Sequence, residues 1–188
     1  SFSHLFVVAA EAGSMPKAIT QGFHRFGGAS FTPDGKQIVF TGNTDNTQHP
    51  DRALESQVFV VNADGSGMKQ LLGATGKSYT SPSISPSGKW LAVQVGTVSF
   101  VNVPELAVMA LNGTAADLVM LPFDRNKGGL TWSKDEQHIY FTAQSNGGAP
   151  IFRINVKTKK SEQLTSIDEG ISSFSMKADK LVFVKTAV

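Results

Sequence analysis

The chain contains no cysteine, which excludes disulfides, thiolate zinc sites and a cysteine nucleophile. It also lacks long apolar runs. The longest, such as Leu5–Ala10 and Val58–Val61, span a handful of residues, far short of the about 20 that a membrane-spanning helix needs. Charged residues are only 17% of the 188 residues and the net charge is +2, too small an imbalance to indicate nucleic-acid binding. We therefore expect neither a nucleic acid nor a membrane as a partner.

What the sequence does contain is an internal repeat. A ten-residue segment occurs four times without a gap, and each copy has an apolar residue, a polar turn and then an apolar run. A second motif alternates with it, in which two short apolar runs flank a turn of small or polar residues. The copies of the first motif are Phe31–Phe40, Ile84–Val93, Trp132–Phe141 and Phe174–Phe183. The copies of the second begin at Leu5, Val58, Leu106 and Ile151.

Short apolar runs separated by Asp-Gly, Ser-Gly and Asn-Gly predict strands joined by tight turns. In the unit of residues 21–73 the predicted strands lie near Phe31 and at Ile38–Thr41, Val58–Val61 and Lys69–Leu72. Four short antiparallel strands in about 40–50 residues are typical of a β-propeller blade. An all-β sandwich would explain the strands but not the gapless alignment. No segment shows the i, i+3, i+4, i+7 pattern of a helix.

The phase of the repeat divides the chain. We predict an all-β fold, a β-propeller of four-stranded antiparallel blades with three whole blades and two half-blades, as an arc of a larger ring. Pairing of the two half-blades into a closed four-bladed ring is the alternative. Aromatic residues at the head of three units, Phe31, Trp132 and Phe174, are expected to pack between blades. The predicted units are 1–20 (half-blade), 21–73, 74–121 and 122–165 (blades) and 166–188 (half-blade).

The alternation of the turns at Pro33–Lys36 and Ala63–Gly67 resembles the TolB-like propeller repeat. It is also similar to the N-terminal propeller of the prolyl oligopeptidase family of serine peptidases, in particular its dipeptidyl peptidase 5 and acylaminoacyl peptidase branch. Segments His4–Thr20 and Leu130–Asp135, together with residues 171–186, resemble that branch. Three turn positions depart from the pattern, and we expect them to weaken the turn signals without moving the register. The departures are Lys134, Met176 and Ala178-Asp179.

The resemblance implies a parent serine peptidase that cleaves short peptides with a Ser-Asp-His triad. Its α/β-hydrolase domain would follow the propeller, and the propeller would pack on that domain and gate the entry of peptide substrates. This chain would be the non-catalytic propeller segment. The alternative is a TolB-like protein-interaction propeller with no enzymatic domain, and a third hypothesis is a four-bladed ring that binds a ligand on its axis. Self-association is left open. Both families are frequently exported in bacteria, which favours a periplasmic or otherwise exported protein.

The chain itself has no recognisable catalytic constellation. The Gly-x-Ser-x-Gly pattern of a nucleophile elbow is absent, and Gly65–Gly67 lies on a predicted hairpin turn. None of the four histidines has the i, i+4 spacing of a helical metal site, and His138 is expected at the surface. We therefore predict no catalytic residue, no cofactor and no metal site.

One loop stands out in a chain of short loops. Residues 44–52 hold two carboxylates, an imidazole and a guanidinium within a few positions, a combination that could bind a cation or a peptide terminus. A polar connection between strands is the simpler interpretation, but loops often carry function. The candidate residues are Asp45, His49, Asp51 and Arg52.

Overall fold

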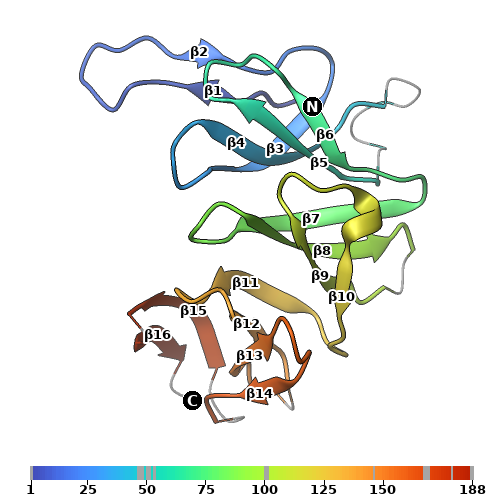
Figure 1. The fold of residues 1–188 in the computed structure, drawn as a ribbon, viewed down its shortest axis with the longest axis vertical. Coiled ribbons are helices and arrows are strands. Elements are labelled where there is room, and N and C mark those ends of the chain that lie inside the picture. The colour runs from blue at the N-terminus through green and yellow to red at the C-terminus, as the bar shows by residue number, and fades with distance from the viewer. Residues whose placement is uncertain are drawn as a thin grey trace.

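A computed structural model describes residues 2–45, 49, 52, 54–99, 102–145, 147–166, 170–178 and 180–186. Within these ranges the regular structure is β apart from one 3-10 turn, η1 (Ala115–Asp117). The strands form five antiparallel sheets, which follow one another along the long axis of the molecule (Figure 1). The strands are β1 (Phe6–Val7), β2 (Lys17–Ala18), β3 (Arg25–Phe31), β4 (Gln37–Asn43), β5 (Gln57–Asn62), β6 (Lys69–Leu72), β7 (Lys77–Ile84), β8 (Trp90–Thr97), β9 (Glu105–Ala110), β10 (Val119–Leu121), β11 (Lys127–Trp132), β12 (His138–Ala143), β13 (Ile151–Asn155), β14 (Ser161–Gln163), β15 (Gly170–Lys177) and β16 (Lys180–Thr186).

Strand order within each sheet follows the chain. Strands β3–β6, β7–β10 and β11–β14 form three four-stranded sheets, called here the first, second and third sheets, and β1–β2 and β15–β16 form two-stranded sheets at the ends. The strands of each sheet fall inside the corresponding predicted unit, whose limits stay a prediction. Among the described residues β16 pairs only with β15, and the β1–β2 sheet lies at the opposite end of the arc (Figure 1). The sheet pairing of a closed four-bladed ring is not formed here.

The core is a series of layers between successive sheets. Because side chains alternate across a strand, Phe40 packs toward Ile19 and the β1–β2 sheet, whereas its neighbour Val39 packs toward Tyr79 of the second sheet. Further layers join the second sheet to the third and the third to β15. Burying a side chain of this size stabilises a fold by roughly 1.5–3 kcal/mol. No sheet could bury both of its faces alone.

A buried hydroxyl holds the first turn of each four-stranded sheet, together with a carboxylate in the first and third sheets and a second hydroxyl in the second. In the third sheet the Ser133 hydroxyl donates to Asp135 Oδ1 at 2.6 Å and accepts the His138 N–H at 2.9 Å. Thr32 and Ser85 occupy the same position in the first two sheets and also accept a backbone N–H five residues later. The hydrogen bond from Ser133 lowers the pKa of Asp135. This network explains why the repeat has Ser or Thr followed two residues later by Asp or Ser.

The fifth position of the ten-residue repeat has a left-handed backbone in all four copies. Its φ is 69° at Gly35, 74° at Gly88, 60° at Glu136 and 46° at Ala178. Glycine adopts this conformation freely, whereas other residues lose roughly 1–2 kcal/mol there. The turn geometry is therefore kept in the third and fourth copies even though their sequences lack glycine.

The last hairpin differs from the other three in register. In the third sheet Trp132 pairs with Ile139, so the repeat predicts that Phe174 pairs with Leu181. Phe174 instead pairs with Phe183, a shift of two residues. The expectation that the sequence departures would leave the register unmoved was wrong.

The cause lies in the turn that precedes β16. Lys177 stands where the other sheets have Asp34, Ser87 and Asp135, so the side-chain oxygen that accepts the backbone N–H two residues later is missing. Lys177 pairs directly with Lys180, leaving a two-residue connection in which Ala178 has the positive φ that tight hairpins require. The chain closes early because nothing holds the longer turn open.

The aromatic residues at the head of the units divide into two groups. Trp132 is buried and its Nε1 donates to the carbonyl oxygen of Ser83 in the preceding sheet at 2.9 Å, and Phe174 packs against the layer between the third sheet and β15, as predicted. Phe31 is 53% exposed, against the prediction. The sheet before it, β1–β2, has no counterpart of β7 to supply the surface that Trp132 covers.

The first strand of each four-stranded sheet also carries a β-bulge that the sequence pattern did not reveal. The register shifts at equivalent places in β3, β7 and β11. The bulged residues have positive φ, namely 59° at Gly28, 53° at Ser81 and 67° at Gly129. These bulges bend the inner strands, as bulges commonly do where a sheet must turn.

Candidate functional site

The candidate loop of residues 44–52 joins β4 to β5. The Asp45 N–H donates to Asn43 Oδ1 at 2.7 Å, and the Arg52 N–H donates to the His49 carbonyl oxygen at 2.8 Å. Asp51 lies outside the described residues, so the four-residue cluster stays a prediction. Within the part of the chain that the structure describes, no group of three His, Asp or Glu residues could hold a metal ion.

The structure places His49 against aromatic rings. Its imidazole meets Phe23 edge-on at 5.4 Å between ring centroids, and Phe23 in turn contacts Phe2 at 5.3 Å. Phe2 and Phe23 are 58% and 53% exposed. This exposed aromatic group lies where the β2–β3 and β4–β5 connections meet, a surface suited to apolar or cationic side chains of a partner.

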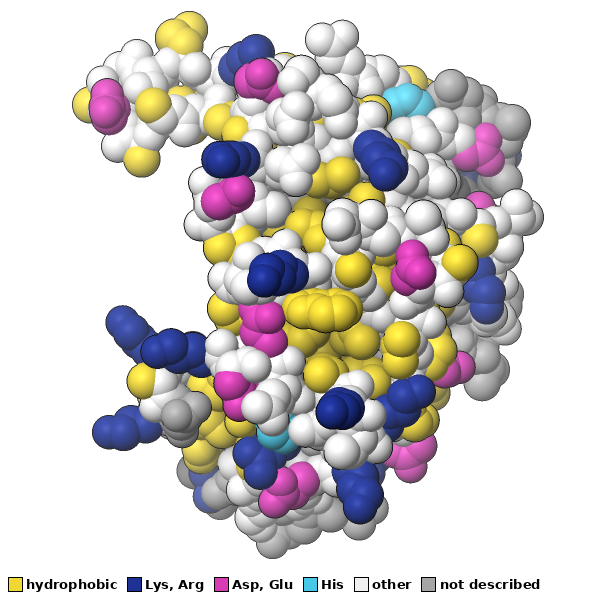
Figure 2. Space-filling view, viewed as in Figure 1, with side chains coloured by type: hydrophobic (Ala, Val, Ile, Leu, Met, Phe, Trp, Pro, Cys, Tyr) yellow, Lys and Arg dark blue, Asp and Glu magenta, His cyan; other side chains and the backbone are white. Residues whose placement is uncertain are grey.

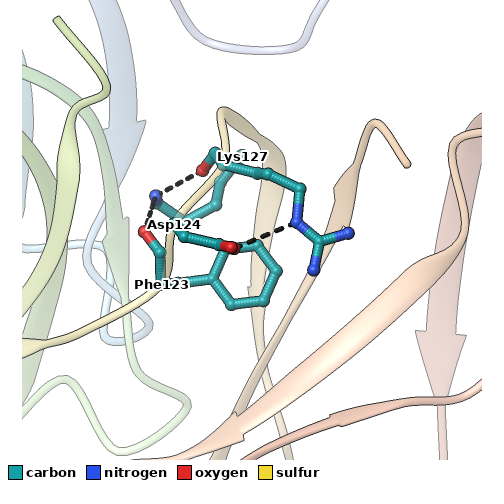
Figure 3. Close-up of polar contacts among 4 residues, drawn as sticks. Phe123, Asp124 and Lys127 are labelled. Atoms are coloured by element: carbon teal, nitrogen blue, oxygen red, sulfur yellow. Dashed lines mark hydrogen bonds and ion pairs between the residues drawn. The ribbon is translucent and has the colours of Figure 1, made fainter. Parts of the chain in front are cut away.

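A second polar cluster, which the sequence analysis missed, lies at the β10–β11 connection (Figure 3). Lys127, the first residue of β11, is only 6% exposed. Its ammonium donates to the carbonyl oxygens of Arg125 at 2.7 Å and Phe123 at 3.5 Å. Burial lowers the pKa of Lys127, and the charges of Glu105 and Asp124 partly oppose that shift. The buried cation fixes the path of the connection by tying together its carbonyl groups.

Arg125 presents its guanidinium beside this buried lysine. The guanidinium carbon lies 5.2 Å from the Phe123 ring centroid and 5.0 Å from that of Phe152. Its Nε donates to Asp124 Oδ1 at 3.0 Å (Figure 3), and this hydrogen bond lowers the pKa of Asp124. The side chain borders an open groove of about 450 Å³ that extends to β14. An oriented guanidinium at a groove is a suitable partner for a carboxylate.

The inner strands enclose a further groove. Residues of β3, β7 and β11 line about 480 Å³ of open space, including the exposed ring of Phe31 and the bulged Ser81. A groove that crosses three neighbouring inner strands offers an extended chain both apolar contacts and backbone groups.

An apolar area covers part of the outer surface. Figure 2 shows it in the middle of the displayed face, over the second sheet, between charged side chains. Trp90, at the start of β8, is 44% exposed and borders an open groove of about 610 Å³ together with Leu71 and Lys69 of the first sheet. A half-exposed tryptophan at such a groove is a typical anchor for a packed partner.

Two residues considered at the sequence level have structural roles. Ser66 lies in an exposed turn, where its hydroxyl donates to Asp64 Oδ1 at 2.7 Å and accepts from Asn62 Nδ2 at 3.1 Å. His138 is half-buried, and its Nε2 lies 3.3 Å from Asn155 Nδ2, in the position that Gln37 occupies in the first sheet. Within the described ranges the structure has no helix of the length and apolarity needed to cross a membrane.

Comparison with known proteins identifies the class first. No family model matches the chain. Among solved structures, TolB from Agrobacterium tumefaciens aligns with a TM-score of 0.69 at 19% identity, covering 93% of this chain and 60% of the other. A puromycin-hydrolysing peptidase from Mycobacterium tuberculosis gives 0.69 at 16% identity, covering 91% and 30%. The β-propeller domain of the trilobed protease from Pyrococcus furiosus gives 0.60 at 15%, covering 86% and 48%. The chain is a β-propeller segment, as the repeats predicted.

Two curated proteins are similar to this chain in sequence, and both have the same name. A dipeptidyl-peptidase 5 from Porphyromonas endodontalis is 33% identical over 125 residues, which is 63% of this chain and 16% of that protein. One from Porphyromonas gingivalis is 25% identical over 157 residues, covering 81% and 23%. The resemblance to the dipeptidyl peptidase 5 branch of the prolyl oligopeptidase family is thereby confirmed. The chain spans less than a quarter of the length of either relative.

Proposed function

We propose that this chain is the propeller segment of a serine peptidase of the dipeptidyl-peptidase 5 kind. In this role it packs on an α/β-hydrolase domain of the same parent chain and gates the entry of short peptides. The similarity to two dipeptidyl-peptidase 5 proteins carries the proposal. The fold alone would not, because TolB and a peptidase align equally well, each with a TM-score of 0.69.

Two surfaces support the division of roles. The groove along the inner strands, with the exposed Phe31, is suited to a passing peptide. The apolar groove at Trp90 is suited to a packed domain. Ser66 of the Gly65–Gly67 turn is engaged in a hydrogen bond with Asp64, and the proposal places the chemistry in the hydrolase domain of the parent.

The first experiment reads the gene and assays the chain. A Gly-x-Ser-x-Gly motif encoded within a few hundred residues after Val188 supports the peptidase, whereas a stop codon directly after it would overturn the proposal. The isolated chain is expected to show no turnover of dipeptidyl chromogenic substrates, because its sequence has no Gly-x-Ser-x-Gly nucleophile elbow. Activity that follows the protein peak through purification would contradict this.

A test of the gating role needs a variant that weakens the contact between neighbouring sheets and leaves the catalytic residues unchanged. Gln94 is buried and its Nε2 donates to the Lys127 carbonyl oxygen of the next sheet at 3.0 Å. In the full-length peptidase, Gln94→Leu is expected to raise kcat/KM for peptides of ten residues relative to dipeptidyl substrates. Gln163→Leu is the matched control. Gln163 Nε2 donates to the carbonyl oxygen of Thr165, two residues later, at 2.8 Å, so this hydrogen bond does not join two sheets. An unchanged ratio for Gln94→Leu would contradict gating.

A TolB-like interaction propeller is the second candidate, because the alignment with TolB covers 93% of this chain, against 91% for the peptidase. It predicts a protein partner that binds the isolated chain and no hydrolase domain in the same gene. The partner would contact the half-exposed Trp90 groove. Two results together would favour this candidate over the peptidase. One is loss of that binding in Trp90→Ala, and the other is a gene that encodes no Gly-x-Ser-x-Gly motif.

A further inference from the structure

The second sheet departs from the repeat at the start of its second strand. In every four-stranded sheet the first residue of the second strand pairs with the last residue of the third. In the first and third sheets both side chains of this pair are polar, and they form a hydrogen bond of 3.4 and 3.3 Å. In the second sheet a tryptophan ring stands opposite the methyl group of an alanine. The three pairs are Gln37–Asn62, Trp90–Ala110 and His138–Asn155.

This change leaves Trp90 uncovered. It is 44% exposed, and among the described residues no group accepts a hydrogen bond from its indole N–H. Trp132, by contrast, is buried and donates to the Ser83 carbonyl oxygen. Complete four-stranded sheets lie on both sides of the second sheet (Figure 1), so the exposure of Trp90 does not arise from the ends of the chain. A position that breaks a repeat without a gain in packing is expected at a functional site.

Trp90 borders the groove of about 610 Å³ that lies between the first and second sheets. Val60 and Leu71 of the first sheet line it and are only 7% and 8% exposed. The half-buried Leu111, in the connection between β9 and β10, lines it from the second sheet. The groove therefore has an aliphatic floor beside an aromatic ring, the arrangement in which a large apolar side chain of a partner is held.

Two lysines add positive charge to this groove. Lys69 on the outer strand β6 and Lys89 in the turn before Trp90 line it, and both are exposed. Asp and Glu are absent from its lining residues. In the part of the chain that the structure describes, neither ammonium group makes an ion pair or a hydrogen bond. Glu136, whose carboxylate interacts with the charge of Lys89, has both oxygens bound to Ser87.

We propose that the groove is filled by a segment of the parent's α/β-hydrolase domain in which a large apolar side chain is flanked by carboxylates. The apolar side chain packs on Trp90 and Leu111, and the carboxylates pair with Lys69 and Lys89. Complementary charges select the partner and fix its register, while the tryptophan contributes most to affinity. This inference rests on the proposed function, which packs that domain on the propeller, and it adds the chemistry of the contact.

Zero-length crosslinking of the full-length peptidase tests the occupant. A carbodiimide joins a lysine amine to a carboxylate when the two groups are in direct contact. We expect tryptic peptides in which Lys69 or Lys89 is joined to Asp or Glu of the hydrolase domain. Lys157 and Lys159 are the internal controls, because they are exposed in the turn before β14, outside the groove, and should give no such products.

The crosslinking result separates this inference from the proposed function. A gene that encodes the nucleophile motif, with no product between the groove lysines and the hydrolase domain, would overturn the inference alone. Products that join these lysines to a second copy of the chain would also overturn it. A gene without the motif would overturn the proposed function and the occupant together.

Peptide binding to the 188-residue chain tests the chemistry without the domain. The probe is acetyl-Asp-Asp-Leu-Asp-Asp-amide, followed by the fluorescence of Trp90, since Trp132 is buried. We expect binding that weakens about tenfold in the Lys69→Gln, Lys89→Gln variant and that weakens as salt screens the charges. The matched control, Lys157→Gln with Lys159→Gln, removes the same charge and should bind like the wild type. An equal loss in both variants, or equal binding of acetyl-Ser-Ser-Leu-Ser-Ser-amide, would overturn the inference.

Discussion

Removing the hydroxyl of Ser133 should show how much its hydrogen bonds stabilise the repeated turn. Ser133→Ala leaves the His138 N–H without the acceptor it has at 2.9 Å. Ser133 is 4% exposed, so water does not readily replace that acceptor. An unsatisfied donor in such a place costs about 1–3 kcal/mol. We expect the free energy of unfolding at pH 7, measured by chemical denaturation, to fall by that amount.

The same substitution should change the acid sensitivity of the fold. The Ser133 hydrogen bond is the main reason that the pKa of Asp135 is lowered. A carboxyl whose pKa is lower in the folded state stabilises the fold above its unfolded pKa, about 3.9. That stabilisation disappears as pH falls through the folded pKa. Ser133→Ala should therefore flatten the loss of stability below about pH 4.

Two variants taken from the other repeats serve as controls. Ser133→Thr copies Thr32 of the first sheet and should unfold like the wild type. Asp135→Ser copies Ser87 of the second sheet, where the hydroxyls of Ser85 and Ser87 lie 3.4 Å apart, and should remove only the acid-dependent part. The reasoning is refuted if Ser133→Ala and Ser133→Thr have equal stability at pH 7.

Three further predictions concern strain, a tie between sheets and the buried cation. Ala178→Gly relieves a φ of 46° and should raise the melting temperature by an amount equivalent to about 1 kcal/mol; a lower value would contradict the strain. Trp132→Phe removes the hydrogen bond to the Ser83 carbonyl oxygen and should cost about 1 kcal/mol in denaturation, unlike Trp90→Phe at a half-exposed site. Lys127 has a lowered pKa in the folded state, so stability should rise as the pH increases through the folded pKa toward the unfolded value of about 10.4. Lys127→Met should abolish that rise, and an unchanged slope would show that other groups cause it.

The strands and turns of this fold could be predicted from the sequence because local signals determine them. Strand β4 (Gln37–Asn43) contains the predicted run Ile38–Thr41, and β6 coincides with Lys69–Leu72. The register of the last hairpin could not be predicted from the repeat, since it depends on the side-chain oxygen acceptor that Lys177 lacks. The bulge at Ser81 also escaped prediction, because serine gives no signal for a φ of 53°.

The candidate surfaces were harder to predict than the strands. Lys127 is a charged residue beside two glycines and reads as part of a solvated loop, yet the surrounding sheets bury it. Its partners are backbone carbonyls, which leave no trace in side-chain patterns. Phe31 was expected inside because the repeat treats all units alike, whereas the sheet before it has only two strands and no counterpart of β7. Contacts between units depend on position in the arc, which a repeat motif does not record.

Within each sheet every strand pairs with its neighbour in sequence, and this bears on how the chain folds. Each sheet can form without contacts to distant parts of the chain, with little loop-closure entropy. Stability then approximates a sum over sheets and the layers between them. Amides of the β1–β2 and β15–β16 sheets, each with one covered face, should exchange with solvent sooner than those of β8 and β12. Slow exchange would spread outward from the middle of the arc.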